Sequence, residues 1–204
     1  MRLVFVILGL CLAQPVVAQD VQAVAQAADA LFPDMPDLQI VPQIADNCGA
    51  DTEVNASAAY CTSTNEILVA EGGIADVRTA YLMAHGFGHA VQVRHGVADV
   101  ALQEITRRPD DEAMLRGWVE RQADCIAGAV LAQAGGPLPD LAALFARDPL
   151  DQPHWGRNPL SRGPHLPVPL QEREMWLATG YDSGVAACAV GEFGADLLVA
   201  ALRR

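Results

Sequence analysis

The sequence predicts an α+β fold that is mainly helical and contains a small sheet. Residues 66–70 (EILVA) form a short apolar run that ends at Gly72 and Gly73, a pattern typical of a β-strand. Apolar residues recur with helical spacing over 77–93 and again over about 112–134. The first half of the chain therefore mixes strands and helices, whereas the second half is mainly helical.

The N-terminal part of the chain adds one helix and one strand to this prediction. Residues 21–32 have helical apolar spacing, which Pro33 and Pro36 interrupt. Residues 38–43 are expected to form a short strand. Because Pro42 cannot donate a hydrogen bond to a neighbouring strand, this strand belongs at the edge of the sheet.

Loops and turns account for most of the remaining chain. The stretch from 46 to 64 is rich in Asn, Ser, Thr and Ala and is expected to be a loop. Gly135-Gly136-Pro137 ends the second long helix. Between 148 and 169 the chain is rich in proline without periodicity, so we expect a long irregular loop. Helix resumes over 170–179, and the segment after Gly194 also has a helical pattern.

The first 18 residues have the pattern of a secretory signal peptide, and residues 19–204 are then expected to form one domain. The apolar run at 3–12 is shorter than the roughly 20 residues of a membrane-spanning helix, and it precedes the small residue Ala18. No later stretch of the sequence is that long and uncharged, so we expect no membrane span. A lipoprotein attached through Cys11 is the alternative, although a large residue precedes this cysteine. We therefore expect a periplasmic or secreted protein.

The composition is acidic, with 25 acidic residues against 13 basic ones, all of them arginine, and a net charge of −12. Nucleic acid binding depends on neutralising phosphates with basic side chains, so nucleic acid is not an expected partner. The same charge would repel anionic membrane surfaces.

Two pairs of side chains in the long helices indicate a metal site. His85 and His89 are four residues apart, so both imidazoles lie on one face of the first helix and can reach one ion. Two histidines at this spacing can equally be exposed or packed side chains. In the second helix Glu120 and Asp124 also share a face, which is either a solvated acidic face or part of the site. Glu120 would complete a His-His-Glu zinc site, and Asp124 would accept a hydrogen bond from a ligand histidine.

Four cysteines follow the signal segment: Cys48, Cys61, Cys125 and Cys188. In an oxidising compartment they predict two disulfides, for which three connectivities are possible. The short loop between Cys48 and Cys61 makes these two the natural first pair, which leaves Cys125 with Cys188. A four-cysteine zinc site is the rival interpretation, although it lacks a close C-x-x-C pair.

Taken together, these features resemble the predicted neutral zinc metallopeptidases, bacterial proteins that belong broadly to the glutamate-ligand zincins. The resemblance runs from Cys48 to about Phe193. It is carried by AYC at 59–61, EILVA at 66–70, HGFGH at 85–89 in place of HExGH, ERQADC at 120–125, Ala127-Gly128, His165, Arg173, Gly180-Tyr181, Gly184 and Cys188.

The resemblance implies a zincin-like domain with zinc as its cofactor. His85, His89 and Glu120 would be the zinc ligands, and Asp124 would orient one of the histidines. The resemblance also implies the two disulfide pairs favoured above. His165 stands where the family has a histidine after the long loop. It would either face the site and stabilise an oxyanion or be an exposed loop residue.

The chain departs from the family at Gly86, which occupies the position of the catalytic glutamate. In the family that glutamate accepts a proton from zinc-bound water, and glycine has no side chain that can do so. Loss of general acid–base catalysis costs ~10² to 10⁴ in rate.

Three hypotheses about function follow. The leading one is an inactive peptidase homologue that retains zinc and binds a peptide or protein in the former substrate cleft, with 66–70 as an edge strand. The second is an active zinc peptidase with another general base, either His165 or an acidic residue of the 104–112 stretch. The third is a metal-free structural or interaction protein.

Overall fold

A computed structural model describes residues 20–49, 56–147, 149–150 and 168–194. The helices are α1 (Val21–Leu31), α2 (Thr79–Arg94), α3 (Val97–Arg107), α4 (Glu112–Gln133), the single turn α5 (Leu141–Leu144) and α6 (Leu170–Ser183), and the strands are β1 (Asp37–Val41), β2 (Ala58–Cys61) and β3 (Glu66–Ala70). The predicted fold class, mainly helical with a small sheet and two disulfides, is confirmed. Within the described residues, no helix is both long and apolar enough to cross a membrane.

The sheet has the strand order β1-β3-β2, so β3 is its central strand. β3 runs parallel to β1, with Leu38 opposite Ile67, and antiparallel to β2, with Tyr60 opposite Ile67. The expectation that 66–70 is an edge strand is therefore wrong, because β2 lies in the segment that we predicted to be a loop. β1 is an edge strand, as Pro42 predicts.

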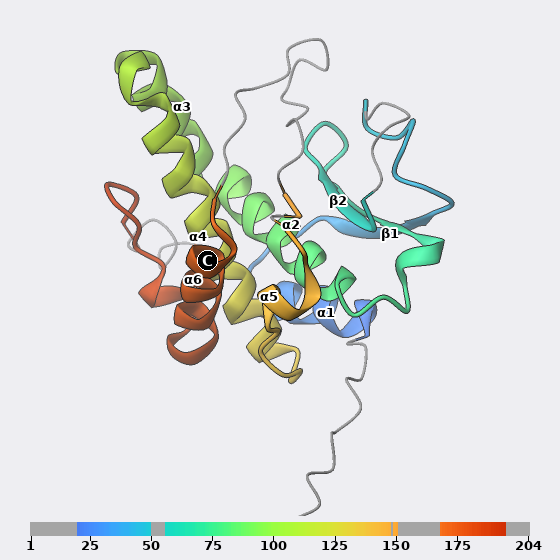
Figure 1. Cartoon of the computed structure of the whole chain (residues 1–204). Coiled ribbons are helices and arrows are strands. Elements are labelled where there is room, and N and C mark those ends of the chain that lie inside the picture. The colour runs from blue at the N-terminus through green and yellow to red at the C-terminus, as the bar shows by residue number, and fades with distance from the viewer. Residues whose placement is uncertain (1–19, 50–55, 148, 151–167, 195–204) are drawn as a thin grey trace, which may run out of the picture.

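Helix α2 runs through the middle of the molecule, with the sheet on one side and α4 and α6 on the other (Figure 1). Twelve of its sixteen residues are buried, which fits a helix covered on most of its circumference. At Gly88 a Cβ atom would lie 2.5 Å from the backbone oxygen of Ala123. The missing side chain at Gly88 thus allows the backbones of α2 and α4 to approach closely.

Helix α6 also packs closely against α4, through a second glycine. A Cβ atom at Gly180 would lie 1.7 Å from the backbone oxygen of Cys125, so only glycine fits at this crossing. The disulfide between Cys125 and Cys188 then ties the chain that follows α6 back to α4. The second disulfide joins Cys48 to Cys61 at the end of β2.

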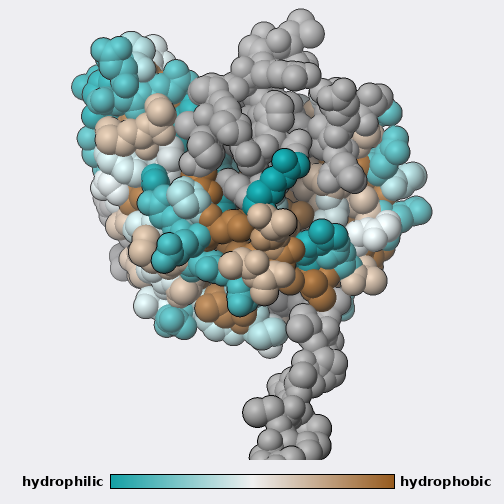
Figure 2. All heavy atoms as spheres, in the orientation of Figure 1, coloured by the Kyte–Doolittle hydropathy of each residue, from teal (hydrophilic) through white to brown (hydrophobic). Residues whose placement is uncertain are grey.

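A surface groove of about 700 Å³ lies between α4 and α6. Its lining includes Met114, Trp118, Met175 and Trp176, of which Met175 is 55% exposed. Figure 2 shows apolar patches among hydrophilic side chains on the face of the molecule that carries α5 and α6. The two histidines and the glutamate of the predicted metal site do not line this groove.

The helices expected over 21–32, 77–93 and 112–134 correspond to α1, α2 and α4, and the one expected over 170–179 continues as α6 to Ser183. The prediction missed α3, whose buried face consists only of Val97 and Ala101. The expected signal peptide, most of the 148–169 loop and the segment after Gly194 lie outside the described residues.

Candidate metal centre

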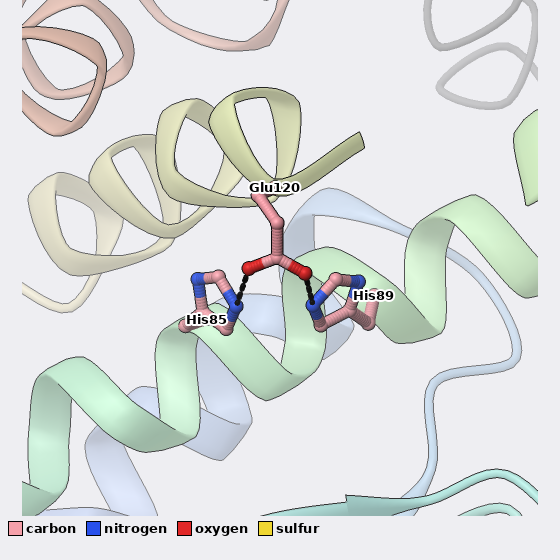
Figure 3. A group of neighbouring side chains, drawn as sticks. All are labelled: His85, His89 and Glu120. Carbon is pink, nitrogen blue, oxygen red and sulfur yellow. Dashed lines mark ion pairs between the residues drawn. The ribbon is translucent and has the colours of Figure 1, made fainter. Parts of the chain in front are cut away.

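Side chains of α2 and α4 converge on one point between the two helices (Figure 3). His85 Nε2 lies 3.5 Å from one carboxylate oxygen of Glu120, and His89 Nε2 lies 3.5 Å from the other. One ligand atom from each of the three residues lies within 4.8 Å of the others. The structure thus brings together the three residues that the sequence predicts as metal ligands.

The donor set and its spacing fit a zinc ion. Each imidazole lies 3.5 Å from a different oxygen of the Glu120 carboxylate, so the carboxylate stands between the two histidines and one ion can contact all three side chains. Two imidazole nitrogens and one carboxylate leave a fourth position for water, as in catalytic zinc sites. The His85 side chain is 4% exposed and that of His89 is 23% exposed, so the site is open on the His89 side.

Asp124 orients His85 from inside the core. Its Oδ1 atom accepts hydrogen bonds from His85 Nδ1 at 2.8 Å and from the hydroxyl of Tyr81 at 2.9 Å. The carboxylate is fully buried. When Nδ1 of His85 donates this bond, Nε2 presents its lone pair toward Glu120, which is the tautomer that a metal ion needs.

Arg173 on α6 is a site residue to which the sequence analysis gave no role. Its side chain is 1% exposed and donates to Asp124 Oδ2 at 2.9 Å, and both of its terminal nitrogens lie 3.4 Å from Glu120 Oε2. The guanidinium therefore lies between two buried carboxylates that would otherwise repel each other. Its place in the resemblance to the family was the one sequence signal that could have identified it.

The environment of His85 favours its protonated form when no metal is bound. Burial alone lowers the pKa of the imidazole, but the carboxylates of Asp124 and Glu120 outweigh burial and raise the pKa from 6.5 to about 9. A metal ion must therefore displace a proton from His85 when it binds.

Gly86 faces the sheet, directly beside the first histidine. A Cβ atom there would lie 3.1 Å from Cδ1 of Ile67 and 3.4 Å from Cβ of Tyr60. The position of the family's general base thus holds no functional group, and it is closely bounded by β2 and β3.

Among the described residues, both glutamates of the 104–112 stretch are paired with arginines. Glu104 is paired with Arg107 and Arg108, and Glu112 is paired with Arg116. Glu112 also precedes Glu120 by eight residues of helix, or ~12 Å along its axis. His165 lies outside the described residues.

A model of the protein family described as "Putative neutral zinc metallopeptidase" matches residues 45–141. The matched segment contains the His85–His89 pair, Gly86, Glu120 and Asp124, and it begins just before Cys48. No curated protein and no solved structure matches the chain. With the His-His-Glu group placed as described, the match shows that segment 45–141 of this chain is similar to the putative neutral zinc metallopeptidases.

Proposed function

We propose that the protein is a zinc-binding member of this family that has lost peptidase activity and binds a peptide or protein in the former substrate cleft. One observation carries the proposal. The ligand set His85, His89 and Glu120 is assembled together with its hydrogen-bonding partner Asp124, whereas Gly86 occupies the position of the proton acceptor.

The residues present can hold zinc but do not supply the proton transfer that peptide hydrolysis needs. When bound, zinc lowers the pKa of its water and polarises a carbonyl oxygen. Asp124 cannot serve as the base, because it is buried behind His85 and accepts bonds from His85, Tyr81 and Arg173. Without a general base we expect hydrolysis to be slower by ~10² to 10⁴ than in a complete site.

Strand β2 is the best-supported place for a bound peptide. Among the described residues β2 pairs only with β3, so its other edge can accept an extended chain. Tyr60 of β2 also lies beside Gly86, next to the first zinc ligand. A peptide added to β2 would therefore lie along the helix that carries the metal site.

The two disulfides support an oxidising location for the protein. Together with the signal-peptide pattern of residues 1–18, they favour export to the periplasm or the medium.

Zinc content and peptide hydrolysis, measured for the natural protein and for Gly86→Glu, test this proposal. We expect about one equivalent of tightly bound zinc in both proteins, and chelator-sensitive hydrolysis only in the variant. Gly86→Ala is the matched control, because it adds the same Cβ atom beside Ile67 without a carboxylate, and it should stay inactive. In Gly86→Glu, contact between the new side chain and Ile67 can shift helix α2 away from the sheet. In that case Gly86→Glu is combined with Ile67→Ala, which removes the contacting atoms.

Two results would overturn the proposal. Chelator-sensitive hydrolysis by the natural protein at rates typical of zinc peptidases would show an active enzyme with another base. Less than about a tenth of an equivalent of tightly bound zinc would instead show a metal-free structural or interaction protein, because a complete ligand set should bind zinc well.

A further inference from the structure

A chain of two buried glutamine side chains leads from His89 to the loop that follows α6. We call residues 184–193 the C-terminal loop; the disulfide at Cys188 holds it against α4. Gln92 follows His89 by one helical turn on α2, and Gln122 follows Glu120 by two residues on α4. Gln92 is 1% exposed and Gln122 is fully buried, so their amides interact with protein groups instead of water.

The hydrogen bonds of the two glutamines have a single consistent direction, which backbone carbonyls of the C-terminal loop and of Val119 set. Gln122 Nε2 lies 3.0 Å from the backbone oxygen of Cys188 and 3.2 Å from that of Phe193. A backbone carbonyl can only accept, so the NH₂ group of Gln122 must face the loop. Its oxygen then faces Gln92.

The orientation of the Gln92 amide is fixed in the same way, and it determines which atom of Gln92 faces the metal site. Its Nε2 atom lies 3.1 Å from Gln122 Oε1 and 2.9 Å from the backbone oxygen of Val119, and both of these atoms are acceptors. The Gln92 oxygen is therefore left to face His89 Nδ1 at 3.0 Å. An amide oxygen only accepts, so Nδ1 of His89 must carry the proton.

The position of this proton determines which nitrogen of His89 can bind a metal ion. With the proton on Nδ1, the lone pair of His89 is on Nε2, the atom that lies 3.5 Å from Glu120. The two histidines thus reach the same tautomer by different means, because His85 donates to the carboxylate of Asp124 and His89 donates to a neutral amide.

We infer that Gln92 and Gln122 are positioning residues that fix the Nδ1–H tautomer of His89. The backbone oxygen of Val119 holds the Gln92 amide directly and the C-terminal loop supports it through Gln122, so both contribute to how well His89 binds a metal ion. The tautomer of His89 can be observed in the metal-free protein. The effect on zinc affinity, in contrast, rests on the zinc site proposed above. Loss of a partner that orients a ligand histidine typically weakens metal binding ~10- to 100-fold.

Two substitutions of Gln92 separate this role from a merely structural one. Gln92→Leu removes the acceptor for His89, so we expect a mixture of tautomers and zinc binding weaker by ~10- to 100-fold. Gln92→Glu keeps an acceptor for His89 but cannot donate to Val119 and Gln122. It should therefore lose stability while it keeps the Nδ1–H tautomer and the natural zinc affinity or a higher one.

The control removes a buried polar group from the same helix without touching the site. Thr79 is fully buried at the start of α2 and donates to the backbone oxygen of Gly73 at 2.7 Å. Thr79→Val should lower the free energy of unfolding but leave the tautomer of His89 unchanged and the zinc dissociation constant within ~2-fold. If Gln92→Leu does not fold, Gln122→Leu tests the next link. It should shift the tautomer in the same direction but by less, because the backbone oxygen of Val119 still accepts from Gln92.

Two measurements decide the outcome. Long-range ¹H–¹⁵N NMR of the metal-free proteins, recorded with neutral imidazoles, reports which nitrogen of His89 carries the proton. Competition with a chromophoric chelator gives the zinc dissociation constant. An Nε2–H tautomer in the natural protein, or equal tautomers and affinities in the natural protein and Gln92→Leu, would overturn the inference. A natural protein that binds no zinc would overturn the proposed function instead, while the NMR result would still decide the tautomer.

Discussion

Arg173 on α6 donates a hydrogen bond to Asp124 on α4 across 2.9 Å, in the core of the protein and with both side chains almost completely buried. The same guanidinium lies 3.4 Å from Glu120, one of the three residues able to bind a metal ion. Helix α6 contributes no metal ligand among the described residues, but through this contact it balances the charge of the site. The position of α6 and the geometry of the metal centre are therefore coupled.

Arg173→Met should destabilise the protein by ~3 to 5 kcal/mol, because it removes the buried guanidinium from two buried carboxylates and leaves only the His85 imidazolium between them. Urea unfolding of the metal-free protein measures this loss. Arg116→Met is the control, since Arg116 forms a partly exposed pair with Glu112 one turn away, and its loss should cost less than ~1 kcal/mol. Equal losses in the two variants would contradict the coupling.

Gly88→Ala should weaken zinc binding and lower stability by ~1 to 3 kcal/mol, because its Cβ atom would lie 2.5 Å from the backbone oxygen of Ala123. Helices α2 and α4 must then separate, which moves the two histidines away from Glu120. Gly72→Ala provides the comparison, since a Cβ atom at Gly72 meets nothing within 4 Å. Thermal unfolding and zinc titration of both variants measure the difference, and unchanged zinc affinity in Gly88→Ala would contradict it.

The stability of the metal-free protein should fall as the pH rises from about 6.5 to about 9. Burial lowers the pKa of His85, but Asp124 and Glu120 raise it further, to about 9, while in the unfolded chain it lies near 6.5. The folded protein thus holds this proton more tightly, and the stability that it contributes is present below pH 6.5 and lost through pH 9. We expect the free energy of unfolding to decrease by up to about 3 kcal/mol over this range.

Urea unfolding in the presence of a chelator, repeated across this pH range, measures the dependence. His85→Asn removes the titrating group and should flatten the curve. The stabilisation gained on adding zinc should change in the opposite sense and increase with pH, because less proton must be displaced. A metal-free protein that becomes more stable between pH 6.5 and 9 would contradict the prediction.

The two disulfides should differ in their effect on the metal centre. Replacing Cys125 and Cys188 by alanine removes a cross-link between residues 63 apart in the sequence, and it should lower the free energy of unfolding by ~4 kcal/mol. Replacing Cys48 and Cys61, which are 13 apart, should lower it by ~3 kcal/mol. Only the first replacement should also weaken zinc binding, because Cys188 belongs to the loop that Gln122 contacts. Zinc affinity measured on the two double variants tests this difference, which equal affinities would refute.

Local rules applied to the sequence were sufficient for much of the fold. The apolar periodicity of α2, α4 and α6 depends only on the pitch of a helix, and it located these elements within a few residues. Strand β2 was not recognised, because it is four residues long and lies in a segment of loop-like composition. Because the prediction lacked β2, it placed β3 at the edge of the sheet. Strand order depends on pairing between distant segments, which local patterns do not reveal.

The sequence by itself determined that His85 and His89 share one helical face and that Gly86 offers no proton acceptor, because both follow from residue identity and the 3.6-residue helical repeat. Only the tertiary structure decided which groups surround those histidines. Arg173 and Gln122 reach the site through the close packing of α4 against α2 and α6, and no local pattern encodes such an approach between helices that are distant in the chain. Side-chain periodicity is a property of one helix, whereas a buried hydrogen-bond network is a property of how several helices pack together.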